Sequence, residues 1–458
     1  MAPEIYSKTH PLRVNQLSAL RERWKSTHSI TTGFVAVASF LLLAKAIAAG
    51  KEVVVAQVFG TSATLEGYLF VFTLYAIPAS IGYSVMFAIL VPLLAVDGNS
   101  PRGSRLFRSE TLGLLLIVGL LLGFAFAIGM HAWLTHGDTG LSPECTTAAI
   151  GAVWPLSVTV VLALLAGLLS TWIMSTGGHA NTLFEAGPAV GIAVAVIFWP
   201  DATLASLVWG TIAGYCLQIL GLAFLLKKCD YMSKPALGFK STLWNKLQVI
   251  FTLVIFTYII TGIGGALDLY LAAKLEQGSI ATMGYANRVM ALFLGLLATA
   301  VGRSALPSLS ATYSTDPVTT TRVAIRYSWI LWLVGTAGFG LVVLSAHQLV
   351  ALIFERGAFT STDTDRVSSV LTASSLQLPF YAAALIVLSL LTSSKRYGVI
   401  LVIAASGLVS KVISAFVLTH HFGLNGLMIS NSIMHCTTLI CGLLAIAGNR
   451  HALTTKSQ

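Results

Sequence analysis

Three charged residues stand inside an otherwise mainly apolar stretch near the N-terminus. Lys45, Lys51 and Glu52 lie within residues 30–60, which read as one membrane helix. A charge at the centre of such a helix costs roughly 2.5–3.5 kcal/mol unless it meets water or a partner. We therefore predict a helix that lines a polar cavity. Two cations would receive an anionic cargo, and the carboxylate would provide charge balance or coupling.

Helical spacing relates these three side chains. Lys45 and Glu52 are seven residues apart, so they share one face at a separation of about 10 Å. Lys51 lies roughly 120° from Lys45 on an ideal helix. Gly50 is a candidate hinge, because a kink there would turn Lys51 toward the same cavity. The alternative is that Lys51 and Glu52 snorkel or pair with each other near one end of the span.

A second polar group occurs in the C-terminal half. Asp268 lies in the apolar stretch 249–273, and Arg288 lies in the stretch 281–309. Arg288 could complete a positive pocket with the first helix, or it could clamp a group of carbonyls. The alternative role for Lys45 is an internal ion pair with Glu66 or Asp268. Lys411 is near the predicted cytoplasmic end of its span, where we expect snorkelling.

Composition excludes a soluble domain. Hydrophobic residues make up 56% of the chain, charged residues 10%, and the mean hydropathy is +0.84. Stretches long enough to cross about 30 Å of hydrocarbon predict an all-α polytopic protein of about twelve transmembrane helices. They cover residues 31–59, 67–96, 111–134, 148–174, 183–199, 204–226, 249–273, 281–309, 327–354, 367–391, 397–418 and 424–447.

The basic residues predict the orientation. They concentrate before the first span and in alternate connections, whereas the opposite connections hold only Lys274, Arg356 and Arg366. Positive charge stays on the cytoplasmic side, so we expect both termini there. Most of the net charge of +10 then lies in loops beside the anionic inner leaflet. No nucleic-acid partner is expected.

The chain divides near its middle into two predicted lobes of six helices around a central cavity. A short echo between the regions of Tyr68 and Tyr285 supports this division, and paired helical bundles are a recurring transporter plan. We predict a basic cytoplasmic segment (1–29), an N-lobe (30–226), a cytoplasmic linker (227–248), a C-lobe (249–447) and a cytoplasmic tail (448–458). The five cysteines show no metal-binding pattern.

Four motifs resemble the MurJ/MviN family of lipid-linked sugar flippases. They are LLLAKAIAAGKEVVVAQVFGTSATLEGYLFVF, YANRVMALFLGLLATAVGRSALPSLS, LIFERGAFTSTDT and FGLNGLMISNSI. The resemblance implies the multidrug/oligosaccharidyl-lipid/polysaccharide (MOP) exporter fold, which includes MATE-like transporters. It also implies movement of a polyprenyl-diphosphate-linked sugar from the cytoplasmic to the periplasmic leaflet of a bacterial inner membrane.

The resemblance also implies roles for individual residues. Lys45, Lys51 and Arg288 match the basic positions proposed to hold the diphosphate, and Glu52 and Glu66 match acidic positions nearby. Lysine at the first two positions departs from the family's usual arginine, which exchanges a bidentate fork for a point charge. The family typically has fourteen spans. Twelve spans here favour an exopolysaccharide or O-antigen repeat as cargo over the peptidoglycan precursor lipid II.

Coupling and alternative functions stay open at the level of sequence. No cofactor is expected, and the drive could be the membrane potential or Na⁺ or H⁺ binding at Glu52, Glu66 or Asp268. Expected partners are the lipid-linked glycan, the bilayer and glycan-assembly enzymes. One alternative is a cation-coupled MATE-like exporter, although three bases disfavour cationic cargo. Another is a polysaccharide polymerase or glycosyltransferase, which would need a larger extramembrane loop than this chain offers.

Overall fold

The structure is a computed structural model of the full chain. It describes residues 43–455 apart from 97–100, 177–180, 200–202, 230, 247, 314 and 395. The predicted basic segment 1–29 lies outside the described residues, as do residues 456–458.

The described residues are mostly helical and contain no strand, which confirms the all-α prediction. Each predicted span overlaps a helix. The first helix covers residues 43–59 of the described chain. The others are α2 (Ala63–Val96), α3 (Pro101–His136), α4 (Pro143–Ser175), α5 (Asn181–Phe184), α6 (Gly187–Phe198), α7 (Leu204–Lys228), α8 (Gln248–Ala273), α9 (Ser279–Tyr313), α10 (Pro317–Phe354), α11 (Ser361–Ser375), α12 (Leu378–Ser393) and α13 (Tyr397–Thr455).

Nine candidate membrane spans are found among the described residues, judged by length and hydropathy. One of these candidates lies in α13, which is 59 residues long and bends at Gly423. Gly423 has φ 57° and ψ −136°, a backbone conformation that glycine adopts readily. The bend divides α13 into two segments that correspond to the predicted spans 397–418 and 424–447.

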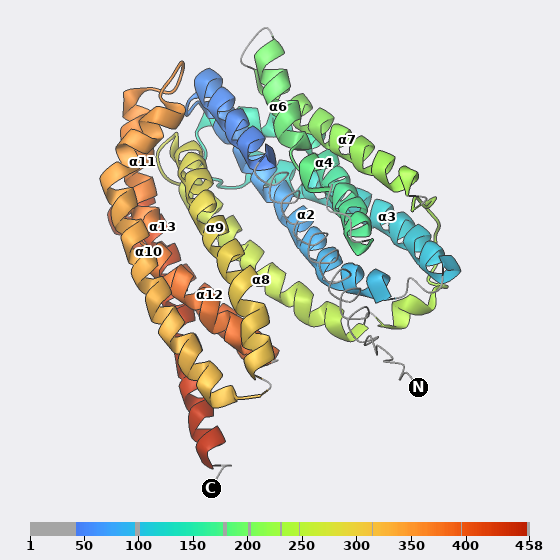
Figure 1. Cartoon of the computed structure of the whole chain (residues 1–458). Coiled ribbons are helices and arrows are strands. Elements are labelled where there is room, and N and C mark those ends of the chain that lie inside the picture. The colour runs from blue at the N-terminus through green and yellow to red at the C-terminus, as the bar shows by residue number, and fades with distance from the viewer. Residues whose placement is uncertain are drawn as a thin grey trace, which may run out of the picture.

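The helices pack as two lobes. In the N-lobe α4 contacts α2, α3 and α7, and α6 packs along α7. In the C-lobe α12 contacts α9, α10 and α13, while α8 contacts α13. The two lobes meet through α2, which contacts α8 and α9. Their ribbons lie close together where the first helix ends and diverge toward the opposite end (Figure 1). The lobe boundaries given above remain a prediction.

Glycines let helices approach closely inside the N-lobe. A Cβ atom on Gly191 of α6 would lie 2.4 Å from the carbonyl oxygen of Gly210 of α7. Such a distance excludes a side chain, so these two helices pack backbone against backbone. Close packing through small residues is how helices associate inside a membrane, where apolar burial gives little driving force.

The connection between the lobes is fastened to α3. The carboxylate of Glu110 accepts hydrogen bonds from the backbone amides of Lys240 (2.7 Å) and Ser241 (3.1 Å) and from Nε1 of Trp244 (2.8 Å). We call residues 231–246 the linker strap. The predicted linker 227–248 therefore begins inside α7, which continues to Lys228, and then follows an ordered path.

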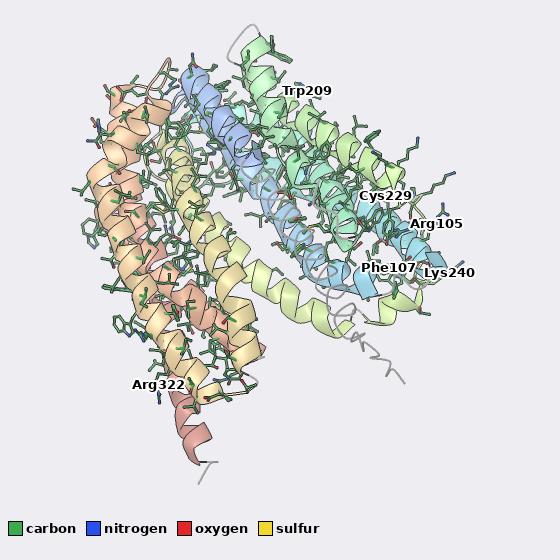
Figure 2. The ribbon with its side chains drawn as sticks, in the orientation of Figure 1. Arg105, Phe107, Trp209, Cys229, Lys240 and Arg322 are labelled. Carbon is green, nitrogen blue, oxygen red and sulfur yellow. The ribbon has the colours of Figure 1, made fainter. Side chains whose placement is uncertain are left out.

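Further contacts hold the linker strap in place. The backbone amide of Ala236 donates to the carbonyl of Ser109 at 2.9 Å, and Arg108 lies 3.8 Å from the centre of the Tyr231 ring. Gly113 lacks a side chain where a Cβ would lie 2.2 Å from the Ala236 carbonyl oxygen. Figure 2 shows Lys240 of the strap and Arg105 of α3 at the same end of the N-lobe.

Candidate functional site between the lobes

An ion cluster joins the two lobes at the predicted position. Oε1 of Glu52 lies 2.7 Å from Nε of Arg288, and the same oxygen is in contact with Nζ of Lys51. Lys51 and Glu52 come from the first helix, whereas Arg288 lies in α9 of the C-lobe. The structure therefore brings together three of the predicted site residues. Their functional roles remain predictions.

The carboxylate neutralises part of the positive charge. Two cations share one anion, so the cluster carries a formal charge of about +1. The side chains of Lys51, Glu52 and Arg288 are 14%, 12% and 29% exposed. Charges in such an environment interact more strongly than they would in water. Within the described chain, Nη1 of Arg288 and Oε2 of Glu52 are buried without a hydrogen-bond partner. The guanidinium thus retains donor capacity for a further anion.

Lys45 is not part of this ion cluster within the described chain. It lies about 9 Å along the helix axis from Lys51 and within electrostatic range of Glu185. Glu185 lines a cavity of about 280 Å³ inside the N-lobe, together with Tyr83, Tyr215 and Gln218. The predicted alternative in which Lys45 pairs with Glu66 or Asp268 is wrong, because both carboxylates are bonded elsewhere.

Glu66 caps a helix of the opposite lobe. Its carboxylate accepts hydrogen bonds from the backbone amides of Gly278 (2.7 Å), Ile280 (2.7 Å) and Ala281 (3.2 Å). These amides lie at the start of α9, where the first turn of a helix has free N–H groups and a positive partial charge. Glu66 thus joins α2 to α9. The predicted coupling role for this residue stays a prediction.

The motif ERGAF forms a loop that docks on the end of the first helix. The backbone amide of Ala358 donates to the carbonyl of Gln57 at 2.8 Å. Gly357 has φ 62°, and a Cβ there would lie 2.3 Å from the Gln57 carbonyl oxygen. The glycine is thus required twice, by its backbone conformation and by the close approach.

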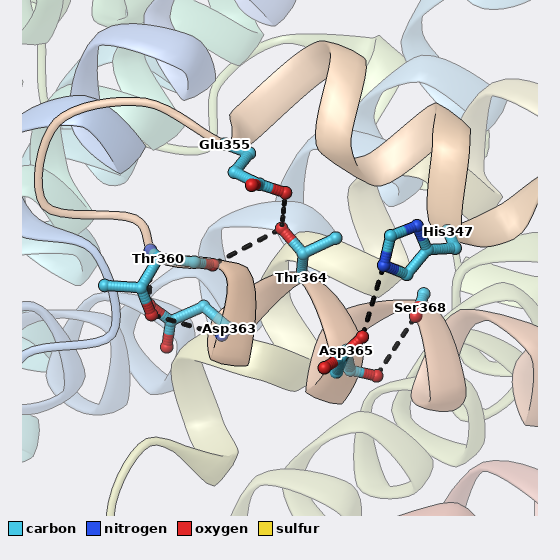
Figure 3. A network of polar contacts seen from close by, with 7 residues as sticks. All are labelled: His347, Glu355, Thr360, Asp363, Thr364, Asp365 and Ser368. Carbon is cyan, nitrogen blue, oxygen red and sulfur yellow. Dashed lines mark hydrogen bonds and ion pairs between the residues drawn. The ribbon is translucent and has the colours of Figure 1, made fainter.

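Side chains around this loop complete the contact between the lobes. Oγ1 of Thr61 donates to Asp363 at 2.7 Å, and the hydroxyl of Tyr285 donates to the carbonyl of Gly60 at 2.9 Å. Asp363 and Thr360 form a capping box at the start of α11. Figure 3 shows this capping box within the C-lobe, where Thr364 also donates to Glu355 at 2.8 Å. The bonds of Thr61, Tyr285 and Glu66 join the two lobes at their predicted periplasmic end.

The first helix continues through Gly50 in the described residues, and the hinge role of this glycine stays a prediction. The prediction for Lys411 is wrong. Lys411 does not snorkel, because it is 4% exposed and its Nζ lies 2.8 Å from Oδ2 of Asp268. Asp268, predicted to balance charge in the shared pocket, is therefore bonded within the C-lobe. The buried carboxylate of Asp268 explains the position of the Lys411 side chain.

The structure also identifies interface residues that sequence reasoning did not select. Tyr285 was noted only as part of a repeat, and the backbone amides at Gly278 and Ile280 carry no side-chain signal. Glu110 could have been noticed as an acidic residue among basic ones at the start of a span. Among the described residues, no group of three or more metal-binding side chains occurs.

Comparison with solved structures defines the class of protein. The fold is similar to that of "Lipid II flippase MurJ, inward closed conformation", with a TM-score of 0.76, 18% identity, and 90% and 87% of the two chains covered. It is also similar to an inward-facing multidrug resistance MATE family transporter of the MOP superfamily (TM-score 0.72, 16% identity, 91% and 96% covered). The chain therefore has the fold of MOP-superfamily transporters, as predicted.

Sequence comparison defines the family. The model of the family described as "Lipid II flippase MurJ" matches residues 55–457. A probable lipid II flippase MurJ of Vibrio cholerae is 24% identical over 87% of this chain and 79% of its own length. One of Bdellovibrio bacteriovorus is 29% identical over 52% of this chain and 46% of its own length. The chain belongs to the MurJ lipid II flippase family, and it is a multi-pass membrane protein of a transport family.

Proposed function

We propose that this protein flips a polyprenyl-diphosphate-linked glycan precursor across the bacterial inner membrane, with lipid II as the first candidate. The observation that carries the proposal is the ion cluster at the lobe interface, where Lys51 and Arg288 share the carboxylate of Glu52. A diphosphate offers several oxygens to the same donors. Family membership and the names of the relatives favour lipid II over the exopolysaccharide or O-antigen repeat that the number of spans suggested.

The proposed mechanism is alternating access between the lobes. With the predicted periplasmic end closed, the diphosphate head would enter from the cytoplasm and form charge-assisted hydrogen bonds with Lys51 and Arg288. It would displace Glu52 from Arg288, and this loss would weaken one of the bonds between the lobes. Closure at the cytoplasmic end and opening at the other would follow as a shift in population.

Release of the cargo needs an additional drive. An anion moves outward with the membrane potential, which contributes about 2.3 kcal/mol per charge per 100 mV. We propose the potential as the main drive, with proton or Na⁺ binding at a carboxylate as the alternative. The described helices place both candidate interface carboxylates, Glu52 and Glu66, in bonds between the lobes.

A cationic small molecule is the second candidate cargo, because the fold is shared with MATE transporters. The site charge argues against it. The two cations Lys51 and Arg288 outnumber the one carboxylate of Glu52, so a cationic cargo would be repelled by the net positive charge. We therefore propose an anionic headgroup as the recognised chemistry.

The test is flipping in proteoliposomes. Fluorescent lipid II, a lipid-linked O-antigen repeat and an undecaprenyl phosphate without sugar would each be offered with a membrane potential of defined sign. We expect lipid II to move at a rate that depends on the potential. Movement of the O-antigen repeat but not of lipid II would reassign the cargo, and movement of none of these lipids, with efflux of a cationic dye, would overturn the proposal.

A further inference from the structure

A second ion pair lies inside the C-lobe, apart from the cluster at the lobe interface. Nζ of Lys411 in α13 lies 2.8 Å from Oδ2 of Asp268 in α8, and the two side chains are 5% and 12% exposed. Bringing two charges out of water is unfavourable unless the pair has good geometry and further polar contacts. Ionisable residues kept inside a membrane protein usually serve a function. The role of this pair therefore needs an explanation.

The surroundings of the pair form a built site. Gly264 lies one helical turn before Asp268, and a Cβ on it would be 3.4 Å from Nζ of Lys411, so the missing side chain leaves room for the ammonium. The side chain of Asn431 faces the carboxylate of Asp268. His435 lies within electrostatic range of Lys411 and packs edge-on against the ring of Tyr381 at 5.1 Å.

Three helical segments contribute to this site. Asp268 comes from α8, Lys411 precedes the bend at Gly423 in α13, and Asn431 follows it. Among the described residues, the titratable group within electrostatic range of the pair is His435 on α13, and Tyr381 on α12 packs against His435. Removing the positive charge would leave a buried carboxylate at a junction of helices, which is far more destabilising than removing both charges.

Carboxylate and amide oxygens at one place are the donors that hard metal cations prefer. In this chain the ammonium of Lys411 already occupies the position in front of Oδ2 of Asp268. Unlike a metal ion, it cannot dissociate, because it is attached to α13. The positive charge at this carboxylate is thus present in every state in which α8 and α13 stay packed together.

We propose that Lys411 is the built-in counter-cation of Asp268, so that the C-lobe holds its packing without Na⁺ or another metal ion at this carboxylate. Na⁺ coupling through Asp268 is then not expected. The proposal concerns the C-lobe alone and does not depend on the cargo, so its failure and that of the proposed function can be told apart.

The test measures the cation dependence of thermal stability. The purified full-length protein in lipid nanodiscs would be melted in NaCl and in choline chloride at equal ionic strength and fixed pH. The variants are Lys411→Met, Asp268→Asn and the double variant Asp268→Asn/Lys411→Met. Lys274→Met is the matched control, because Lys274 pairs with Asp138 at an exposed position. Binding of radioactive ²²Na⁺ provides a second readout.

We expect the wild type, the Lys274→Met control and the double variant to melt at the same temperature in both salts. In choline chloride, Lys411→Met should melt at a lower temperature than the wild type. In NaCl its melting temperature should rise by about 3–5 °C, because a bound ion stabilises the folded state by mass action. The double variant should be more stable than Lys411→Met.

Two results would overturn the proposal. One is a stabilisation of the wild type by Na⁺ that Asp268→Asn abolishes, which would show a metal site at Asp268 despite the lysine. The other is a Lys411→Met protein that gains neither Na⁺ stabilisation nor ²²Na⁺ binding. If Lys411→Met does not fold, the wild type and the double variant still test the proposal. Binding of ²²Na⁺ by the wild type but not by the double variant would contradict it.

Discussion

Nε of Arg288 lies 2.7 Å from Oε1 of Glu52, and this ion pair connects α9 of the C-lobe to the first helix of the N-lobe. Lys51 contacts the same carboxylate oxygen. The cations proposed to receive the cargo are therefore bonded to a residue of the protein itself.

Arg288→Ala should lower the rate of lipid II flipping by at least about tenfold, because it removes a charged donor from a partly buried anion site. Arg288→Lys should fall between the wild type and Arg288→Ala, since it keeps the charge but loses the planar fork. Arg322→Ala, at the far end of the C-lobe (Figure 2), is the control. Flipping in proteoliposomes measures all three, and equal rates for Arg288→Ala and the control would contradict the diphosphate site.

Glu52→Gln should bind the lipid-linked diphosphate more tightly and flip it more slowly. The amide cannot neutralise Lys51 and Arg288, so the cations become fully available to the headgroup, and release becomes harder. We expect affinity to rise by up to about tenfold, which corresponds to roughly 1.4 kcal/mol.

Binding of a fluorescent headgroup analogue and single-turnover flipping would separate these two effects. The control is Glu276→Gln, whose side chain is 86% exposed. Weaker binding by Glu52→Gln would show that the carboxylate does not compete with the cargo.

Gly357→Ala should weaken the closed contact between the lobes. The added methyl group would meet the carbonyl oxygen of Gln57 at 2.3 Å, and alanine is strained at φ 62°. We expect a loss of about 1–3 kcal/mol from the closed state. Gly340→Ala is the matched control, because nothing lies within 4 Å of its added Cβ.

The measurement for Gly357→Ala is labelling of a cysteine placed at Thr61, where Thr61 donates to Asp363 in the closed interface. A membrane-impermeant reagent should label this cysteine faster in the Gly357→Ala background than in the Gly340→Ala background. Identical labelling rates would exclude a role for the loop in closing this end.

Glu66→Gln should lower the melting temperature by roughly 2–4 °C and leave the ion dependence of flipping unchanged. One carbonyl oxygen replaces two charged acceptor oxygens, so part of the cap on α9 is lost. Flipping would be measured with and without Na⁺ and pH gradients. If the variant instead loses its dependence on one gradient, Glu66 is the coupling residue and the cap is a secondary role.

Glu110→Ala should release the linker strap, because three donors lose their acceptor at once. Limited trypsin digestion should then cut after Lys234 or Lys240 faster than in the wild type. Glu144→Ala, in the first turn of α4, is the control for loss of a carboxylate. Unchanged digestion of the strap would mean that the other contacts to α3 suffice.

Sequence alone predicted the fold class and the meeting of Lys51 and Arg288, for one physical reason. Intramembrane charges must find partners, so their positions in two separate apolar stretches already required a shared polar environment. Hydropathy predicted the spans, because a helix that crosses the bilayer needs about 20 mostly apolar residues. The ERGAF motif indicated the family, but its docking on Gln57 became apparent only in three dimensions.

Other partners that are distant in sequence could not be predicted. Lys411 and Asp268 are 143 residues apart, and a lysine near a span end reads as snorkelling until its neighbour is known. Glu66 binds backbone amides, which leave no trace in residue type. The lysines of the linker strap predict only a basic connection. Its bonds to Glu110 come from the main chain and one indole, which residue type does not reveal.

The shared carboxylate of Glu52 has one more consequence for the proposed cycle. A flippase has to reset without cargo after each turnover, and two bare cations facing each other across the closing lobes would oppose that step. In that cycle Glu52 would take the place of the departed phosphate, so that the unloaded protein could close over its own site.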